Sequence, residues 1–245
     1  MGKYLKIVKR YEKSAEKGSQ PGSEPSPRRS HGRQDFRKDI QQISELAAVI
    51  DALSQKDGSK VFCFTSSRSG EGVSSVTANV ARLLAVTHPL KKILLLDCNL
   101  QNPIQHAAFD IPESPGLCDV LVRNSKYYEC VRKVSPNGLH VMPYGRAGLN
   151  MVFLLENGQL SALIDEARKS YDFIFMDCPA VLESAYSLMI ANVSDIVFLV
   201  IQANRTQWEV AQRAKNSLQE HGCHIGGVIL NRVLKVIPNW IYNSL

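Results

Sequence analysis

A polar, glycine-bearing stretch between an apolar run and a helix-forming segment carries the residues best suited to chemistry in this sequence. The apolar run is Val61-Phe62-Cys63-Phe64-Thr65, and the stretch after it reads Ser66-Ser67-Arg68-Ser69-Gly70-Glu71-Gly72-Val73-Ser74-Ser75. A buried strand, a glycine-bearing loop and a helix form an anion site, because the loop N–H groups and the helix N-terminus point toward the anion. We therefore predict that the residues from Ser69 to Ser75 bind the phosphates of a nucleotide.

The pattern to compare is G-x-x-x-x-G-K-[ST], in which the lysine reaches the β- and γ-phosphates and the hydroxyl binds Mg²⁺. Gly72 and Ser74 fall on the last glycine and the hydroxyl, Ser67 replaces the first glycine, and Val73 stands in the place of the lysine. The sequence thus predicts a loop whose backbone N–H groups can bind phosphate but which lacks the lysine ammonium group of the pattern. Arg68, in the same loop, is a candidate to reach the phosphates instead.

Three polar residues, Asp97, Asp177 and Asn231, each close another apolar run. Ligands of a parallel sheet bind beyond the carboxyl ends of its strands, and a buried carboxylate is costly unless it meets a cation or hydrogen-bond donors. We predict that Ser74, Asp97 and Asp177 hold Mg²⁺ if a nucleotide binds, and that Asp97 and Asp177 are the candidate catalytic residues. The alternative role for a single aspartate of this kind is a helix cap or a loop hydrogen bond.

The elements that must position these residues follow from hydrophobic periodicity. Apolar runs expected as strands occupy residues 61–65, 93–97, 173–177, 196–201 and 225–230, with a shorter one at 139–142. Helical spacing predicts helices over residues 36–54, 73–85 and 206–220. Apolar strands that alternate with helices indicate an α/β fold, a parallel-stranded sheet flanked by helices. Residues 112–150, interrupted by four prolines, are expected to hold a short helix and the short strand.

Charge divides the chain into a basic tail and a neutral body. Residues 1–33 contain nine Lys/Arg and three acids, and account for the whole net charge of +6. Residues 3–17 fit a basic amphipathic helix that docks on an anionic membrane or a partner, with a mobile tail as the alternative. Residues 18–33 are predicted to be a disordered linker, so the folded domain is expected over 34–245, with order beginning near Asp35. This distribution argues against a nucleic-acid-binding face.

Six cysteines without a C-x-x-C pair are expected to be reduced core residues of a cytosolic protein. The sequence has no apolar run near the ~20 residues that span a bilayer and no signal-peptide pattern. Lys6 stands where a myristoylation site needs Ser or Thr. We therefore predict a cytoplasmic protein, peripheral at the inner face of the membrane if the tail binds there.

Several motifs resemble those of the bacterial tyrosine kinases (BY-kinases) that regulate capsule and exopolysaccharide export, a branch of the MinD/ParA-like P-loop ATPases. The resemblance covers residues 36 to 243, and its motifs beyond the loop are LLLDCNLQNP (94–103), PGLCDVL (115–121), DCP (177–179), GVILNR (227–232) and IPNWIY (237–242). It implies a P-loop NTPase fold that takes ATP or ADP with Mg²⁺, with Asn231 and Arg232 beside the adenine. It also implies a membrane polysaccharide copolymerase as partner, and a homo-oligomer formed through an N-terminal helix, which residues 36–54 match only loosely.

The sequence departs from the pattern of that family at chemically important positions. Family members carry Lys at the position of Val73, Asp at that of Asn99 and usually Arg at that of Gln101, and they end in a cluster of tyrosines where this chain has only Tyr242. Losing a charged hydrogen bond to phosphate weakens binding by about 1.5–3 kcal/mol. Losing a hydrogen-bond donor that stabilises the charge of the transition state lowers the reaction rate by about 10²–10³-fold. Nucleotide binding therefore survives these changes better than catalysis does.

These departures predict a pseudokinase, a regulatory or structural partner in exopolysaccharide or capsule biosynthesis or export with weak or no nucleotide binding. The alternative is an active ATP-dependent tyrosine kinase or ATPase that uses an atypical loop. A ParA/MinD-like positioning protein is less favoured, because such proteins carry a further lysine near the start of the loop and Ser66-Ser67-Arg68 offers none.

Overall fold

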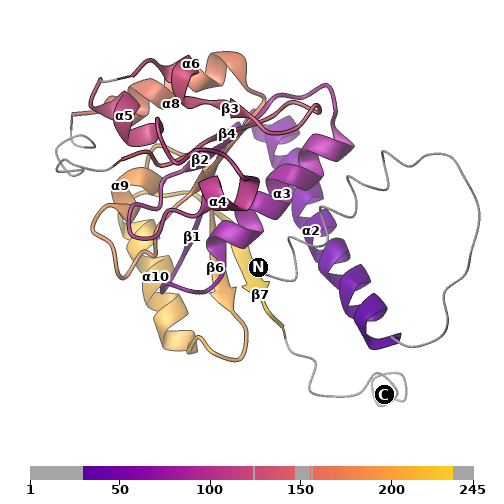
Figure 1. Ribbon diagram of the computed structural model, residues 1–245. Helices are drawn as coiled ribbons and strands as arrows, with labels where there is room; N and C mark the ends of the chain where they lie inside the picture. The colour runs from indigo at the N-terminus through magenta and orange to yellow at the C-terminus, as the bar shows by residue number, and fades with distance from the viewer. Residues whose placement is uncertain (1–29, 124, 147–154, 156, 234–245) are drawn as a thin grey trace, which may run out of the picture.

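The computed structural model describes residues 30–123, 125–146, 155 and 157–233, and the side chains of its first helix from residue 42 onward. The predicted amphipathic segment 3–17 and the C-terminal motif 237–242 lie outside the described residues. Figure 1 shows one sheet with helices on both of its faces. Among the described helices, none is both long enough and apolar enough to cross a bilayer.

Within the described residues the sheet has seven strands, in the order β3-β4-β2-β5-β1-β6-β7. The strands are β1 (Val61–Ser66), β2 (Ile93–Asp97), β3 (Arg132–Lys133), β4 (Leu139–Met142), β5 (Phe173–Asp177), β6 (Ile196–Gln202) and β7 (Ile225–Asn231). All neighbouring strands pair in parallel except β3 and β4, which are antiparallel. The predicted parallel sheet is confirmed, and each predicted strand is present.

Side chains of alternate residues along the strands form two buried clusters, one on each face of the sheet. The first cluster packs under α2 (Ser30–Asp57) and α3 (Val73–Thr87). The second packs under α8 (Gln159–Ser170), α9 (Ser187–Ala191), α10 (Trp208–Glu220) and the short α5 (Leu117–Leu121). The remaining short helices are α4 (Gln105–Phe109) and α6 (Tyr127–Cys130). Burial on both faces explains why the strand sequences are apolar without alternation.

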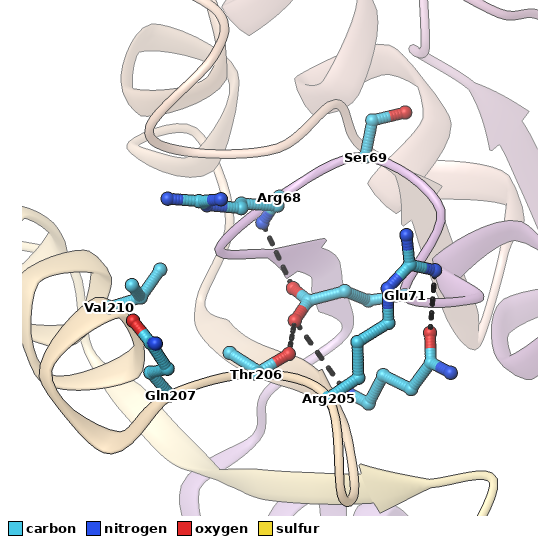
Figure 2. Close-up of a pocket in the computed structure, with 8 residues that line it drawn as sticks. Arg68, Ser69, Glu71, Arg205, Thr206, Gln207 and Val210 are labelled. Carbon is cyan, nitrogen blue, oxygen red and sulfur yellow. Dashed lines mark hydrogen bonds between the residues drawn. The ribbon is translucent and has the colours of Figure 1, made fainter.

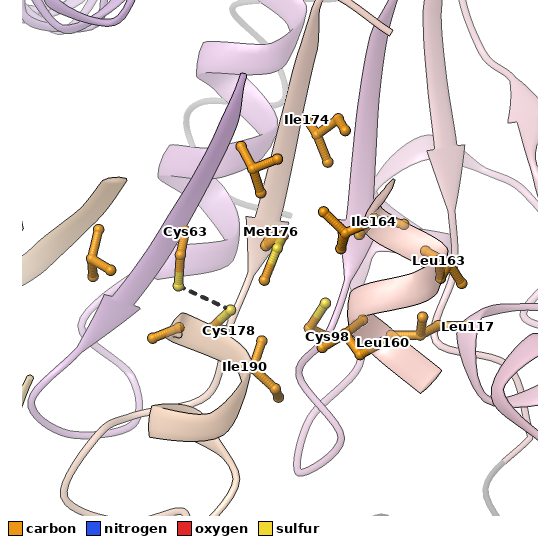
Figure 3. Packing of buried hydrophobic residues seen from close by; sticks show 14 of the residues in the cluster. Cys63, Cys98, Leu117, Leu160, Leu163, Ile164, Ile174, Met176, Cys178 and Ile190 are labelled. Atoms are coloured by element: carbon orange, nitrogen blue, oxygen red, sulfur yellow. Dashed lines mark hydrogen bonds between the residues drawn. The ribbon is translucent and has the colours of Figure 1, made fainter. Parts of the chain in front are cut away.

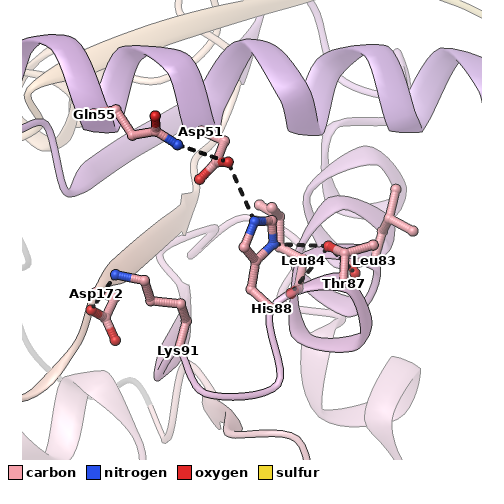
Figure 4. A network of polar contacts seen from close by, with 8 residues as sticks. All are labelled: Asp51, Gln55, Leu83, Leu84, Thr87, His88, Lys91 and Asp172. Atoms are coloured by element: carbon pink, nitrogen blue, oxygen red, sulfur yellow. Dashed lines mark hydrogen bonds and ion pairs between the residues drawn. The ribbon is translucent and has the colours of Figure 1, made fainter.

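The first cluster fixes α3, the helix that begins at the glycine-bearing loop. Phenylalanine rings from β1, β5 and β6 contact one another there at centroid distances of 5.4–6.4 Å. At the far end of α3, the His88 ring lies 3.3 Å from a carboxylate oxygen of Asp51 in α2, which also accepts a hydrogen bond from Gln55 (Figure 4). These contacts pack α3 against α2 and the sheet, so that its first turn lies at the carboxyl edge.

The second cluster contains all six cysteines, and two of them, Cys98 and Cys178, directly follow the strand ends at that edge. All six cysteines are free and buried, and the Sγ of Cys63 donates to the Sγ of Cys178 at 3.2 Å (Figure 3). Burial raises the pKa of the Cys178 thiol, so it stays protonated. The prediction that the cysteines are core residues is confirmed.

One predicted boundary and the predicted content of one segment differ from the structure. Helix α2 begins at Ser30 rather than near Asp35, so residues 30–33, predicted as the end of a disordered linker, are helical. The composition of residues 18–33 placed the start of the folded region too late. Adding a residue to a helix that already exists costs little free energy, and no proline between Pro27 and Ser30 stops the helix from extending. Residues 112–150 hold α5, α6, β3 and β4, a further helix and a further strand beyond those predicted.

Candidate functional site

The loop between β1 and α3 crosses the carboxyl edge of the sheet, as the sequence predicts. Gly72 caps α3 with φ 96°, a left-handed conformation that favours glycine. A Cβ at this position would also collide with the side-chain amide of Asn231. The N–H of Val76 donates to the carbonyl of Gly72 at 3.1 Å, so the helix continues directly from the loop.

Glu71 folds back onto the loop rather than toward the ligand side. Its carboxylate is buried, and Oε2 accepts hydrogen bonds from the N–H and hydroxyl of Ser67, both at 2.8 Å, and from the N–H of Arg68 at 2.9 Å. The hydroxyl of Thr206 donates to the other oxygen (Figure 2). The sequence placed Glu71 in the loop correctly, but it did not indicate that the Glu71 side chain accepts hydrogen bonds from the N–H groups at the start of the loop.

The lysine position is filled by a core side chain. Val73 is 7% exposed and belongs to the same buried cluster as Phe62 and Phe64. Arg68, the candidate replacement, is exposed and lines a cavity of about 240 Å³ with the segment 202–210. In Figure 2 its side chain extends away from Ser69, toward Val210. The role of Arg68 toward a phosphate stays a prediction.

The two aspartates lie side by side at the ends of neighbouring strands, because β2 pairs with β5 in the register Asp97↔Asp177. Both are fully buried. Burial raises the pKa of both carboxyls, and the charge of Asp177 raises that of Asp97 further. Backbone N–H groups of Asn99, Ile104 and Gln105 donate to Asp97 at 3.2, 3.0 and 2.9 Å and offset part of this cost.

Gln105 is a site residue that the sequence did not reveal. Its side chain is fully buried, and Nε2 donates to Oδ2 of Asp177 at 2.7 Å and to the carbonyl of Ser74 at 3.1 Å. A hydrogen bond from the Ser74 side chain to Asp177 lowers the pKa of that carboxyl. The three predicted metal ligands, Ser74, Asp97 and Asp177, therefore meet in one network around Gln105. An uncharged residue eight positions after Asp97 carries no pattern that a single sequence exposes.

The oxygen atoms of this network fit a magnesium ion. Within the described residues, Oδ1 of Asp177 and Oε1 of Gln105 are buried without a hydrogen-bond partner. In the described part of the chain, no three or more His, Cys, Asp or Glu side chains are grouped so that they alone could hold a metal ion. Mg²⁺ is usually held by one or two carboxylates together with waters and substrate phosphates, so a hydroxyl and two aspartates suit it.

The residues expected beside the adenine contact the loop itself. Nδ2 of Asn231 donates to the carbonyl of Glu71 at 2.8 Å, and Nη1 of Arg232 donates to the carbonyl of Gly70 at 3.0 Å. Ser75 is exposed in the first turn of α3. The structure therefore brings the predicted nucleotide-binding residues together, with Asn231 and Arg232 on the β7 side and the aspartates on the β2–β5 side.

Comparison with known proteins identifies the family. Residues 59–220 match the family model described as "AAA domain". The tyrosine-protein kinase YwqD of Bacillus subtilis is 33% identical over 172 residues, which cover 70% of this chain and 72% of YwqD. This chain belongs to the bacterial tyrosine kinase family of P-loop proteins. The tyrosine-protein kinase CpsD of Streptococcus agalactiae is 28% identical over 182 residues, 74% of this chain and 78% of CpsD.

Solved structures agree with this assignment to the bacterial tyrosine kinases. The VpsO kinase domain superposes with a TM-score of 0.70 at 30% identity, covering 81% of this chain and 99% of that domain. MinD of Pyrococcus horikoshii, solved with Mg-ADP, shares the fold with a TM-score of 0.60 at 22% identity, over 76% of each chain. The predicted P-loop fold class is confirmed.

Proposed function

We propose that this protein is a degenerate bacterial tyrosine kinase that acts as a regulatory or structural partner in exopolysaccharide or capsule biosynthesis or export, with weak or no nucleotide binding. The observation that carries the proposal is Val73. An apolar side chain buried in the core stands where the family has the lysine that reaches the β- and γ-phosphates.

Two further positions support the loss of phosphoryl transfer. Asn99 stands where relatives have an aspartate, and its Oδ1 accepts a hydrogen bond from the N–H of Asn102 at 3.3 Å. A neutral amide neither removes a proton nor balances the charge of a cation. Gln101 stands where relatives usually have arginine, and its Nε2 donates to the carbonyl of Glu183 at 3.0 Å. Both side chains therefore serve the local loop structure.

The features that remain favour a ligand-binding or structural role over catalysis. The loop N–H groups from Gly70 to Ser75 would face the α- and β-phosphates of a nucleotide. Ser74, Asp97 and Asp177 would hold Mg²⁺, which would neutralise part of the negative charge of the phosphates. Ionised, unpaired carboxylates at this depth are costly, so the metal would bind more tightly as pH rises past the raised pKa values of the pair.

The partner that this proposal implies is a membrane polysaccharide copolymerase. The chimerical protein CapA2B2 has the same fold, with a TM-score of 0.73 at 23% identity over 79% of this chain and 84% of that chain. The basic segment 3–17 is the proposed contact with that partner or with an anionic membrane surface, which would place the protein at the inner face of the membrane. A homo-oligomer formed through α2 is a further expectation from the family.

Turnover tests the proposal directly. We expect purified full-length protein with Mg·ATP to release no phosphate and to form no phosphotyrosine above background, with or without the cytoplasmic segment of a copolymerase. Turnover that Asp97→Ala abolishes would overturn the proposal in favour of an active kinase with an atypical loop. The observation that favours this second candidate is the exposed guanidinium of Arg68 beside the loop. Arg68→Gln would then abolish turnover as well.

A further inference from the structure

Three consecutive backbone N–H groups of the loop are bound by carboxylates of the protein itself. Glu71 takes those of Ser67 and Arg68. The N–H of Ser69 donates to Oε2 of Glu183 at 2.9 Å. An anion-binding loop in this fold normally offers its N–H groups to phosphate, so Glu183 occupies a position at which a ligand anion would compete with it.

The two carboxylates differ in how firmly they are held. Glu71 is 3% exposed, and Thr206 and the loop fix both of its oxygens. Glu183 is exposed, and its bond to Ser69 lies at the surface. Glu71 is thus a structural part of the loop, whereas the side chain of Glu183 is free to rotate into water at little cost.

The backbone around Glu183 is nevertheless tied to the site. Glu183 lies between β5 and α9, six residues after Asp177. The N–H of Val181 donates to the carbonyl of Ser66 at 2.8 Å, and Gln101 donates to the carbonyl of Glu183. These bonds hold the Glu183 backbone beside the loop, so its carboxylate returns to the same place whenever it is not displaced.

We take the end of the loop at which Glu183 binds the Ser69 N–H to be the end that would face a γ-phosphate. The last glycine and the start of the helix cradle the α- and β-phosphates, and the lysine reaches the β- and γ-phosphates. Glu183 instead precedes that cradle, at Ser69, and approaches from the β5 side that also carries Asp177. Asn231 approaches from the opposite, β7 side. This end of the loop therefore has a carboxylate and no lysine.

We propose that Glu183 determines nucleotide specificity, and makes the site select a nucleoside diphosphate over a triphosphate. A triphosphate brings roughly one more negative charge to this end than a diphosphate does, and a like charge at short range repels it. The α/β cradle, which a diphosphate uses, has no carboxylate bound to it among the described contacts. The inference rests on the proposed function only in requiring that the loop accepts a nucleotide.

Calorimetry on the full-length protein tests this inference, with Mg·ADP and the non-hydrolysable Mg·β,γ-imido-ATP as the two probes. We expect the wild-type protein to bind ADP at least fivefold more tightly than the ATP analogue. Glu183→Gln keeps the shape of the side chain and removes its charge, so the analogue should bind several-fold more tightly and the ratio should approach one. Glu220→Gln, at the exposed far end of α10, is the matched control and should leave the ratio unchanged.

Each outcome separates this inference from the proposed function. A wild-type protein without preference for ADP, or a ratio that Glu183→Gln does not change, would overturn the specificity role. Binding of neither nucleotide by any variant would also overturn it, while leaving the structural role of the proposed function intact. Kinase turnover would overturn the proposed function alone, because the specificity is measured with an analogue that is not hydrolysed. A thermal melt of each variant verifies that it is folded.

Discussion

Placing a lysine at position 73, where the loop pattern has one and this chain has Val73, is the most direct test of the missing charge. Val73 is the first residue of α3 and is 7% exposed, with its side chain in the cluster that contains Phe62 and Phe64. In Val73→Lys the four-carbon stem would keep part of these contacts while the ammonium group reaches the surface of the loop. The substitution therefore adds a charge to the phosphate cradle with limited repacking.

Val73→Lys should change two measured quantities, the affinity for Mg·ATP and the free energy of unfolding. A charged hydrogen bond to phosphate contributes about 1.5–3 kcal/mol, which corresponds to roughly ten- to a hundredfold tighter binding of Mg·ATP. Full burial of a valine side chain is worth about 1.5 kcal/mol, and the lysine stem recovers part of that amount. We expect the free energy of unfolding to fall by about 1 kcal/mol, which a domain of ordinary stability tolerates.

Calorimetry with Mg·ATP and urea denaturation together measure both effects. Val73→Met is the matched control, because methionine has a similar length and no charge. We expect Val73→Lys to bind Mg·ATP at least tenfold more tightly than Val73→Met, with similar stability in the two variants. Equal affinity of the two variants would refute the reasoning, since it would mean that the missing charge does not limit binding.

The remaining predictions concern the buried network and the tail. Because burial raises the pKa of Asp177 in the folded state, the wild-type protein without metal should lose stability as pH rises from about 4 through the raised value. Burial also raises the pKa of Asp97, so Asp177→Asn should reduce this loss without abolishing it, and be about 1–3 kcal/mol more stable in urea at pH 8, but not at pH 4; a constant difference across pH would contradict the assignment. Gln105→Leu leaves Asp177 and the Ser74 carbonyl without their donor and should lower the unfolding free energy by about 2–3 kcal/mol, and an unchanged urea midpoint would disprove its structural role. Deleting residues 1–29, which leaves α2 whole, should preserve the urea midpoint and weaken co-sedimentation with anionic vesicles or with a copolymerase; unchanged co-sedimentation would remove any role for the tail.

The strands and the glycine-bearing loop of this fold could be predicted from the sequence, because both depend on local residue patterns. Strands buried on both faces must be apolar throughout, and β2 and β5 are therefore recognisable as uninterrupted runs. Each run ends in a carboxylate, Asp97 or Asp177, which marks the carboxyl edge of the sheet. The glycine-bearing loop before α3 follows the same logic, since Gly72 adopts a conformation that few other residues adopt.

The start of the folded region could not be predicted from composition, because it depends on the helix that follows it. Residues 30–33 have the composition of the tail, yet they extend α2 because helix growth needs no particular side chain once a helix exists. Composition reports the average tendency of a segment, whereas a helix end depends on its neighbours.

By itself the sequence determined the α/β framework, the position of the loop and the absence of a lysine from it, because these depend on residue type and on spacing along the chain. Only the tertiary structure showed that Glu71 turns back onto its own loop, that Gln105 joins Ser74 to Asp177, and that Glu183 binds the Ser69 N–H group. The last two contacts join residues far apart in the chain, and all three depend on where each side chain points. Such pairings arise only when the strands are in register, so no local pattern encodes them.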